Sequence, residues 1–180
     1  MSISRPVSLS LGLCALLLLA LAPFARGAGL SADMYLATKD GQGGKVGTAT
    51  FTDNGDGLDV MVDFMGLPPG QHGLHVHENP DCAPTTKDGQ VTPAGAAGGH
   101  FDPDKTGKHL GPNGGGHKGD LPFITAAADG TAKATLHVKG VKSADFASRS
   151  LMIHAGGDNY SDTPASLGGG GARFACGLIR

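Results

Sequence analysis

DNGDGLDVMVDF, residues 53–64, carries the clearest indication of the fold class. From residue 58 to residue 64, Leu, Val, Val and Phe at every second position alternate with Asp, Met and Asp. Side chains on a β-strand alternate between its two faces, so this pattern is typical of a strand with one buried face. The preceding DNGDG has the composition of a hairpin turn. The stretch therefore predicts a β-hairpin.

Similar runs recur along the rest of the chain. Residues 133–139 alternate in the same way, and weaker strand candidates lie at 33–38, 45–52, 71–78, 123–128, 150–154 and 173–179. A longer turn is predicted at residues 39–45, and no helix is predicted. The 31 glycines and 11 prolines among 180 residues supply turn signals between these runs. We therefore expect an all-β sandwich or barrel with eight strands.

The amino terminus has the layout of a secretory signal peptide. One arginine precedes an apolar run from Leu9 to Ala22, and small residues follow. The run is shorter than the roughly 20 residues that a membrane span needs. We therefore expect residues 1–27 to be removed, and residues 28–180 to form one exported domain without stable membrane association. The formal net charge of -2 and the absence of tryptophan argue against a nucleic-acid partner.

Two cysteines remain after this cleavage, Cys82 and Cys176. Disulfides persist outside the cytoplasm, so we expect the two to pair. The loop that they would close spans almost the whole domain. In the chain-entropy description, closing such a loop stabilises the fold by at most about 4 to 5 kcal/mol.

Two long segments interrupt the strand rhythm, one from Asn79 to Leu121 and one from Ala155 to Ala172. Loops of this length in a compact domain are uncommon and tend to be functional or disordered. Function is favoured here because the segments are rich in histidine and aspartate. The run LGGGGAR, residues 167–173, fits either a flexible connector or glycines that let the backbone pack close to a site.

Histidine supplies the strongest chemical signal in the sequence. His75 and His77 are one residue apart in a predicted strand, so both rings point to the same face. An isolated pair of this kind fits surface histidines as well as it fits a metal site. Five further candidate ligands follow in the chain: His100, His109, His117, Asp120 and His154. Imidazole suits zinc and copper, and zinc also accepts a carboxylate.

These seven side chains are one fewer than two four-coordinate ions need. An imidazole that loses both ring protons can bridge two ions, and His100, which lies between the two groups in sequence, is the natural bridge. A water molecule would also complete the count. The group that includes the carboxylate suits a structural zinc, whereas a group of imidazoles alone suits copper and redox change.

Four motifs, in this order, resemble the copper/zinc superoxide dismutases and particularly their exported bacterial branch: GLHVHENPDC (73–82), GGHFDPDKTGKHLGPNGGGHKGDLP (98–122), IHAGGDNYSD (153–162) and GGGGARFACG (168–177). The resemblance covers nearly all of residues 31–180. It implies an eight-stranded antiparallel Greek-key β-sandwich or flattened barrel with two long functional loops, in a periplasmic protein. It also makes Cys82–Cys176 the structural disulfide.

The resemblance implies a role for each candidate side chain. Copper would be held by His75, His77, His100 and His154. Zinc would be held by His100, His109, His117 and Asp120. Asp158 would hydrogen-bond one ligand of each metal, and His72 would tie the backbone together near the copper strand without binding metal. Arg173 would attract and dock the small superoxide anion.

The implied activity is the disproportionation of two superoxide anions. Copper(II) would take an electron from one anion and release dioxygen, and copper(I) would give an electron to a second, which leaves as hydrogen peroxide after gaining two protons. In this cycle His100 would leave copper and carry a proton. Bacterial relatives include monomers and dimers, so the resemblance allows a homodimer.

Two other function classes compete with this interpretation. A metal buffer or chaperone on the same fold would be expected to lack copper ligands or the arginine, and all of them are present. A zinc hydrolase needs an open metal position and usually a nearby general base. The chain has no HExxH motif, and its only glutamate, Glu78, is predicted to point away from His75 and His77.

Other charged side chains are interpreted as surface groups. The segment between His154 and Arg173 carries few charges that could guide an anion. We therefore expect a positive field from lysines of the other long segment: Lys87, Lys105, Lys108 and Lys118. His137 is predicted to face solvent without a functional role, and Asp102 and Asp104 are predicted to be loop charges.

Overall fold

The computed structural model describes Met1 and residues 29–180. The predicted signal peptide therefore falls, apart from Met1, outside the described residues. The strands are β1 (Leu30–Thr38), β2 (Gly41–Asn54), β3 (Gly57–Phe64), β4 (Gly70–His72), β5 (Leu74–His77), β6 (Thr85–Lys87), β7 (Gln90–Thr92), β8 (Ile124–Ala126), β9 (Ala132–Lys139), β10 (Arg149–His154) and β11 (Arg173–Ile179). Short helices are η1 (Gly95–Ala97), α1 (Ser143–Phe146) and η2 (Leu167–Gly169). The prediction of an all-β fold is confirmed.

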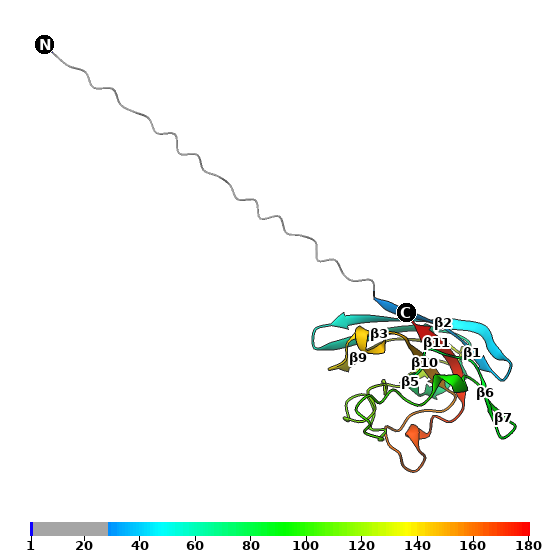
Figure 1. Ribbon diagram of the computed structural model, residues 1–180. Coiled ribbons are helices and arrows are strands. Elements are labelled where there is room, and N and C mark those ends of the chain that lie inside the picture. The colour runs from blue at the N-terminus through cyan, green and yellow to red at the C-terminus, as the bar shows by residue number, and fades with distance from the viewer. Residues whose placement is uncertain (2–28) are drawn as a thin grey trace.

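One antiparallel sheet runs in the order β5-β10-β11-β1-β2-β3-β9. The β4–β8 pair connects the two edges of this sheet. At one edge, β4 continues into β5 through Gly73. At the other, β8 continues into β9 through a turn in which Ala127 N–H donates to the Thr131 carbonyl. Strands that are distant in sequence, such as β3 and β9, thus lie side by side, as in a Greek key. The long loops gather on one side of this curled sheet (Figure 1).

The core forms as the alternation predicts. On β3, Val60, Val62 and Phe64 are buried, whereas Met61 and Asp63 are exposed. The hairpin predicted from DNGDG is present, because β2 ends at Asn54 and β3 begins at Gly57. The largest fully buried side chains of the described residues include three phenylalanines, Phe51, Phe64 and Phe146.

The structure corrects the prediction in several places. The strand predicted over 71–78 is divided at Gly73, where the chain passes from the β4–β8 pair to the main sheet. The turn predicted over 39–45 is shorter, because β2 already begins at Gly41 and register shifts near Tyr35 absorb the irregular stretch. The segment after Asn79 contains the β6–β7 hairpin.

The prediction that the chain has no helix is also corrected. α1 forms a single turn in which Asp145 accepts a hydrogen bond from the backbone N–H of Lys142 and Phe146 reaches the core. Within residues 29–180, no helix combines the length and the apolar character that a membrane span requires.

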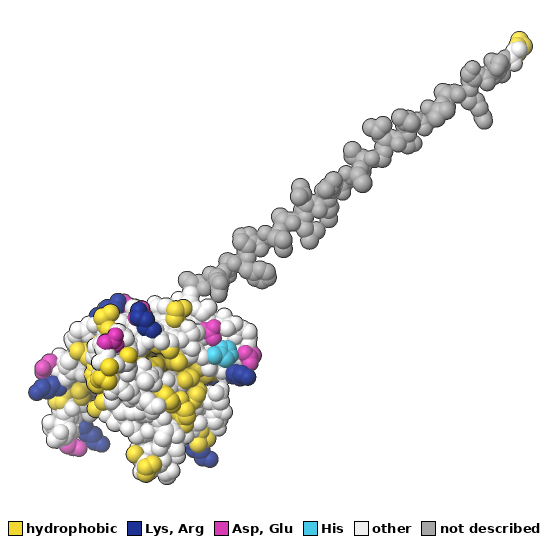
Figure 2. Space-filling view, turned by 180° about the vertical axis from the view of Figure 1, so that it is seen from behind, with side chains coloured by type: hydrophobic (Ala, Val, Ile, Leu, Met, Phe, Trp, Pro, Cys, Tyr) yellow, Lys and Arg dark blue, Asp and Glu magenta, His cyan; other side chains and the backbone are white. Residues whose placement is uncertain are grey.

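Acidic and basic side chains lie next to each other in small groups on the face shown in Figure 2. One such group joins β3 and β9. His137 faces solvent, as predicted, and its Nδ1 lies 2.7 Å from Asp59 Oδ1 on the neighbouring strand. Its Nε2 lies 3.3 Å from Asp56 Oδ1. The hydrogen bond with Asp59, supported by the one with Asp56, raises the pKa of His137.

We predict that His137→Gln makes the stability of the fold less dependent on pH. Because the folded-state pKa lies above the unfolded value, the charged ring stabilises the fold below pH of about 6.5, and this contribution is lost as the pH rises through the folded-state pKa. Urea unfolding should therefore show a small deficit for the variant at about pH 5.5 that disappears at about pH 9.5.

The matched control is Lys133→Gln, which removes the Lys133–Asp63 ion pair of 3.0 Å between the same two strands. This ion pair contains no histidine, so the control deficit should be nearly equal at both pH values. A His137→Gln deficit that is also equal at both would contradict the prediction.

Candidate metal centre

Strand β5 provides the base of the centre. Leu74 and Val76 pack into the core, and His75 and His77 point to the opposite face. β10 runs antiparallel beside β5, and its last residue is His154. The sheet alone therefore brings three of the predicted imidazoles to one place.

Segment 99–121 adds further ligands because it is hydrogen-bonded along the backbone of β5. Phe101 N–H donates to the Val76 carbonyl at 2.8 Å, and Val76 N–H donates to the Gly119 carbonyl at 2.8 Å. The resulting bridges place His100 opposite His77 and Asp120 opposite His75. A Cβ on Gly119 would lie 2.2 Å from the Val76 carbonyl oxygen, so this approach requires glycine.

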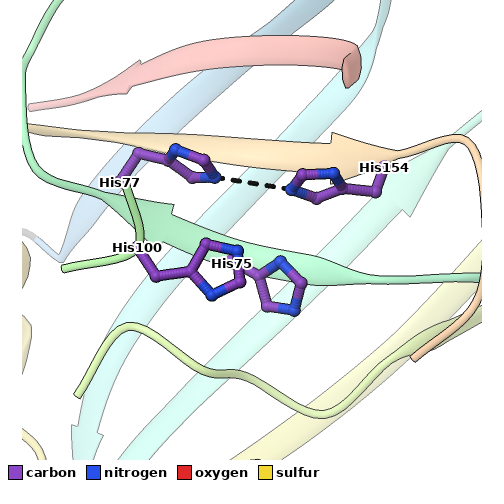
Figure 3. Close-up of side chains that lie close together, drawn as sticks. All are labelled: His75, His77, His100 and His154. Carbon is purple, nitrogen blue, oxygen red and sulfur yellow. Dashed lines mark hydrogen bonds between the residues drawn. The ribbon is translucent and has the colours of Figure 1, made fainter. Parts of the chain in front are cut away.

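The first cluster consists of His75, His77, His100 and His154 (Figure 3). One ring nitrogen from each residue lies within 4.8 Å of those of the others, and all four side chains are buried. These are the four residues that the sequence predicts as copper ligands.

Hydrogen bonds fix which nitrogen each ring presents to the first cluster. Nδ1 of His77 donates to the Gly98 carbonyl at 2.9 Å, and Nδ1 of His154 donates to the Gly171 carbonyl at 3.3 Å. The Nε2 atoms of both rings then carry no proton and can only accept a hydrogen bond, yet they lie only 3.4 Å apart, the contact drawn as a dashed line in Figure 3. Acceptor lone pairs repel at this distance unless a cation lies between them.

The remaining rings of the first cluster complete this arrangement. His75 Nδ1 and His100 Nε2 are buried and have no hydrogen-bond partner. Buried polar atoms are normally paired, so these two unpaired nitrogens, next to the Nε2 atoms of His77 and His154 that have no proton to share, call for a ligand. The first cluster fits a metal ion that prefers imidazole.

The second cluster consists of His100, His109, His117 and Asp120, the predicted zinc ligands. Ligand atoms of His75, His100, His109 and Asp120 lie within 4.8 Å of one another. His117 is slightly farther out, with its Nδ1 3.4 Å from Asp120 Oδ1. The structure thus brings all four predicted residues together, and it also places His75 beside them.

Apart from the contact between His100 Nδ1 and Asp120 Oδ1, the ligand atoms of the second cluster lie close together without hydrogen-bonding one another. His109 Nδ1 lies 2.9 Å from Asp120 Oδ2, but neither atom has a hydrogen-bond partner of good geometry. His117 Nδ1 is also buried and unpaired. Two or three imidazole nitrogens and a carboxylate oxygen around one point suit zinc.

Asp158 connects the two clusters. His75 Nε2 donates to one of its oxygens and His109 Nε2 donates to the other, each at 2.7 Å. Burial alone would raise the pKa of Asp158, but the hydrogen bonds from His109 and His75 hold it well below its usual range. A carboxylate in this position fixes the tautomer and orientation of both rings.

Burial keeps the first cluster in its metal-binding form. It lowers the pKa of His154 to about 3 and that of His100 to about 4, in the latter case against the hydrogen bond with Asp120. Both rings are therefore neutral at pH 7, as a metal ligand must be. Burial also opposes protonation of His109, but the adjacent carboxylate of Asp120 and the hydrogen bond with Asp158 raise its pKa to about 9. A metal ion must displace that proton.

Arg173 begins β11, and its guanidinium is fixed at the edge of the first cluster. It donates to the Ala94 carbonyl at 2.5 Å and to the Gly98 carbonyl at 2.6 Å. Gly98 also accepts the hydrogen bond from His77 Nδ1, so one carbonyl links the arginine to the cluster. Burial lowers the pKa of Arg173, which still leaves the group charged at pH 7.

The predicted disulfide Cys82–Cys176 is confirmed. It links the loop that follows β5 to β11, three residues after Arg173. His72 lies outside both clusters. Its Nδ1 is 2.8 Å from the His154 carbonyl and its Nε2 is 2.7 Å from the Pro68 carbonyl, so the ring joins three backbone segments.

The other predicted surface groups are not part of either cluster. Glu78 is exposed and accepts a hydrogen bond from Gly99 N–H. Asp102 accepts one from Gly107 N–H, and Asp104 is exposed. Among the four predicted lysines, Lys118 forms an ion pair with Asp145 at 3.2 Å, whereas the other three are exposed.

Sequence reasoning missed two supports of the centre. Asp162 accepts a hydrogen bond from the backbone N–H of His109, although the sequence shows it only as a loop charge. Gly168, with a φ of +70°, lies against Asp158 and His109, so glycines of LGGGGAR do let the backbone pack close to the site. In the sequence, the run of glycines indicated a role for Gly168, whereas no pattern distinguished Asp162 from the other loop charges.

Comparisons with known proteins agree with this geometry. A family described as "Copper/zinc superoxide dismutase (SODC)" matches residues 45–179. The chain is 56% identical over 149 residues to the Cu-Zn superoxide dismutase of Brucella abortus, which covers 81% of this chain and 85% of that protein. It is 46% identical over 167 residues to the Escherichia coli protein of the same name, covering 92% and 96%.

Solved structures are similar over the same region. The Cu/Zn superoxide dismutase from Brucella abortus matches with a TM-score of 0.83 and 53% identity, covering 84% of this chain and 99% of that one. The solution structure of the monomeric copper, zinc superoxide dismutase from Salmonella enterica matches with a TM-score of 0.75 and 47% identity, covering 85% and 100%.

We predict that Gly168→Ala weakens metal binding at the second cluster. A Cβ at residue 168 would lie 2.0 Å from Asp158 Oδ1 and 2.8 Å from His109 Nε2, so the bond between these two groups must break. Loss of a supporting partner typically costs roughly 10- to 100-fold in metal affinity. Competition with a zinc chelator measures this loss.

Gly169→Ala is the matched control. Gly169 also has a positive φ, +77°, but the nearest atom to its Cβ would be 3.8 Å away. The control should lose about 1 kcal/mol of stability through backbone strain and keep its metal affinity. Equal loss of zinc affinity in both variants would show that strain, and not displacement of Asp158, is responsible.

Proposed function

This chain belongs to the copper/zinc superoxide dismutase family, and we propose that one copper ion binds in the first cluster and one zinc ion in the second. The chain is a copper- and zinc-dependent oxidoreductase whose substrate is the superoxide anion. The proposed copper ligands are His75, His77, His100 and His154. The proposed zinc ligands are His100, His109, His117 and Asp120.

The observation that carries this assignment is the position of the His100 ring. Its Nε2 belongs to the first cluster and is unpaired, and its Nδ1 lies 3.0 Å from Asp120 Oδ1 in the second. One imidazole thus offers a nitrogen to each cluster. Since the second cluster alone contains a carboxylate, zinc suits it, and the all-imidazole first cluster suits copper.

When bound, copper supplies the one-electron oxidation and reduction that convert two superoxide anions into dioxygen and hydrogen peroxide. The protein supplies the rest. His100 can hold a proton at Nε2 while its Nδ1 stays in the second cluster, so this ring can deliver one of the two protons that the peroxide product needs, and solvent water supplies the other. Asp158 keeps the rings of His75 and His109 in place during this change.

Arg173 is proposed to dock the substrate. The Ala94 and Gly98 carbonyls hold its guanidinium beside the first cluster, and its remaining N–H groups can donate to a small anion. A permanent positive charge beside the first cluster also attracts superoxide from solution. This feature favours an enzyme over a metal buffer, which would have no use for an anion-binding arginine.

We also infer that residues 1–27 are a signal peptide and that residues 28–180 act in the periplasm. The apolar run at the amino terminus supports this, and so does the disulfide, which persists in an oxidising compartment. All proposed metal ligands come from one chain, so the proposed activity does not depend on a homodimer.

We predict that His154→Ala and His117→Ala separate the two metals. His154 belongs only to the first cluster, so its loss should remove copper and leave zinc. His117 belongs only to the second cluster, so its loss should remove zinc and leave copper. Elemental analysis after loading checks both, with His137→Ala as a surface control that keeps about one ion of each. Identical losses in the two variants would refute separate sites.

We predict that Arg173→Ala slows superoxide removal by about 10- to 100-fold and reduces its salt dependence, because local charge accelerates association by such factors. Copper and zinc contents should not change. Arg149→Lys is the control. Arg149 stacks on Phe101 at 4.1 Å and donates to the Glu78 carbonyl, and it belongs to neither cluster. Unchanged kinetics in Arg173→Ala would exclude the docking role.

A further inference from the structure

His109 is held at three points, and two of them lie in the segment 155–172, here called the covering loop. Its Nδ1 faces Asp120, and its Nε2 donates to Asp158 of the covering loop at 2.7 Å. Its backbone N–H donates to Asp162 Oδ2 at 2.9 Å, also in the covering loop. The ring and the backbone of this one residue are therefore fixed by two different carboxylates.

The second oxygen of Asp162 closes the covering loop on itself. Leu167 N–H donates to Asp162 Oδ1 at 3.1 Å. Next to this bond, Gly168 N–H donates to the Ser161 carbonyl at 3.0 Å, and Asn159 N–H donates to the Gly168 carbonyl at 3.1 Å. Hydrogen bonds from the amides of His109 and Leu167 keep the pKa of Asp162 below its usual value. The charged carboxylate thus joins two chain segments.

The ends of the covering loop lie at the other important groups of the centre. The loop begins directly after His154 and ends directly before Arg173. Its own carbonyl at Gly171 accepts the hydrogen bond from His154 Nδ1. The covering loop therefore connects the strand that carries His154 to the strand that carries Arg173.

We propose that Asp162 is a positioning residue that couples zinc binding to the order of the covering loop. This inference rests on the proposed zinc site. Asp158 sets the rotation of the His109 ring, and Asp162 sets the position of the backbone that carries it. Both are needed to point Nδ1 at the ion. Because coupling is reciprocal, an ordered covering loop favours zinc, and zinc favours an ordered covering loop.

The test compares Asp162→Ala and Asp162→Asn with the parent protein. Alanine removes both hydrogen bonds, whereas asparagine keeps one carbonyl oxygen and loses the charge. Zinc release to a chelator should be about tenfold faster in Asp162→Ala, at the low end for such supporting residues because Asp162 is exposed. Asp162→Asn should lie between Asp162→Ala and the parent.

Hydrogen exchange provides the readout that a merely structural role would not change. In the parent, zinc added to the metal-free protein should slow amide exchange in residues 159–168. In Asp162→Ala this zinc-dependent protection should be lost, in addition to any faster exchange of the metal-free protein that follows from the missing bond to Leu167 N–H. Asp129→Ala is the control, because Asp129 is also exposed and accepts the Thr131 N–H at 3.0 Å in a distant turn.

Each outcome decides one question. Failure of the parent protein to bind zinc would remove the proposed zinc site itself. Normal zinc binding in the parent with equal release rates in Asp162→Ala would overturn only the role of Asp162. Faster exchange of residues 159–168 in the metal-free variant, with unchanged zinc-dependent protection, would make Asp162 a loop stabiliser and also overturn the coupling.

Discussion

The backbone pairing between β5 and the segment 99–121 is the constraint on which the metal centre depends. It places His100 opposite His77 and Asp120 opposite His75, although these residues are far apart in the chain. Without this pairing, His75 and His77 would be a surface pair, and His100 and Asp120 of the second cluster would not lie beside them. Gly119 permits the close approach, so a residue without chemistry of its own is as necessary as the ligands.

The same pairing explains the electrostatics. Imidazoles that are crowded into a buried site cannot all be charged, and burial holds His154 and His100 neutral. The excess of unpaired nitrogens is unfavourable for folding alone, because buried polar atoms without partners are costly. Such an arrangement is explained by the cations that it binds. The carboxylate of Asp120 offers a ligand, and the carboxylate of Asp158 orients the rings of His75 and His109.

The fold was largely predictable from the sequence, because alternation on strands such as 58–64 is a local property. The orientation of His75 and His77 followed from the same local rule. Partners across space were harder. The grouping of the ligands depended on a count and on resemblance to a family. Only the structure reveals the divided strand at Gly73, the β6–β7 hairpin and the bond from His109 to Asp162. The sequence does not distinguish a loop aspartate that holds a neighbouring segment, such as Asp162, from one that is only a surface charge.

The claim that His100 offers one nitrogen to each ion is tested by a crystal structure of the protein loaded with copper and zinc, with anomalous scattering to identify each ion. In the oxidised protein, His100 Nδ1 is expected to lie about 2.0 to 2.1 Å from the zinc ion, and His100 Nε2 is expected to bind the copper ion. A structure in which His100 contacts one ion or none, with both metals bound, would contradict this claim.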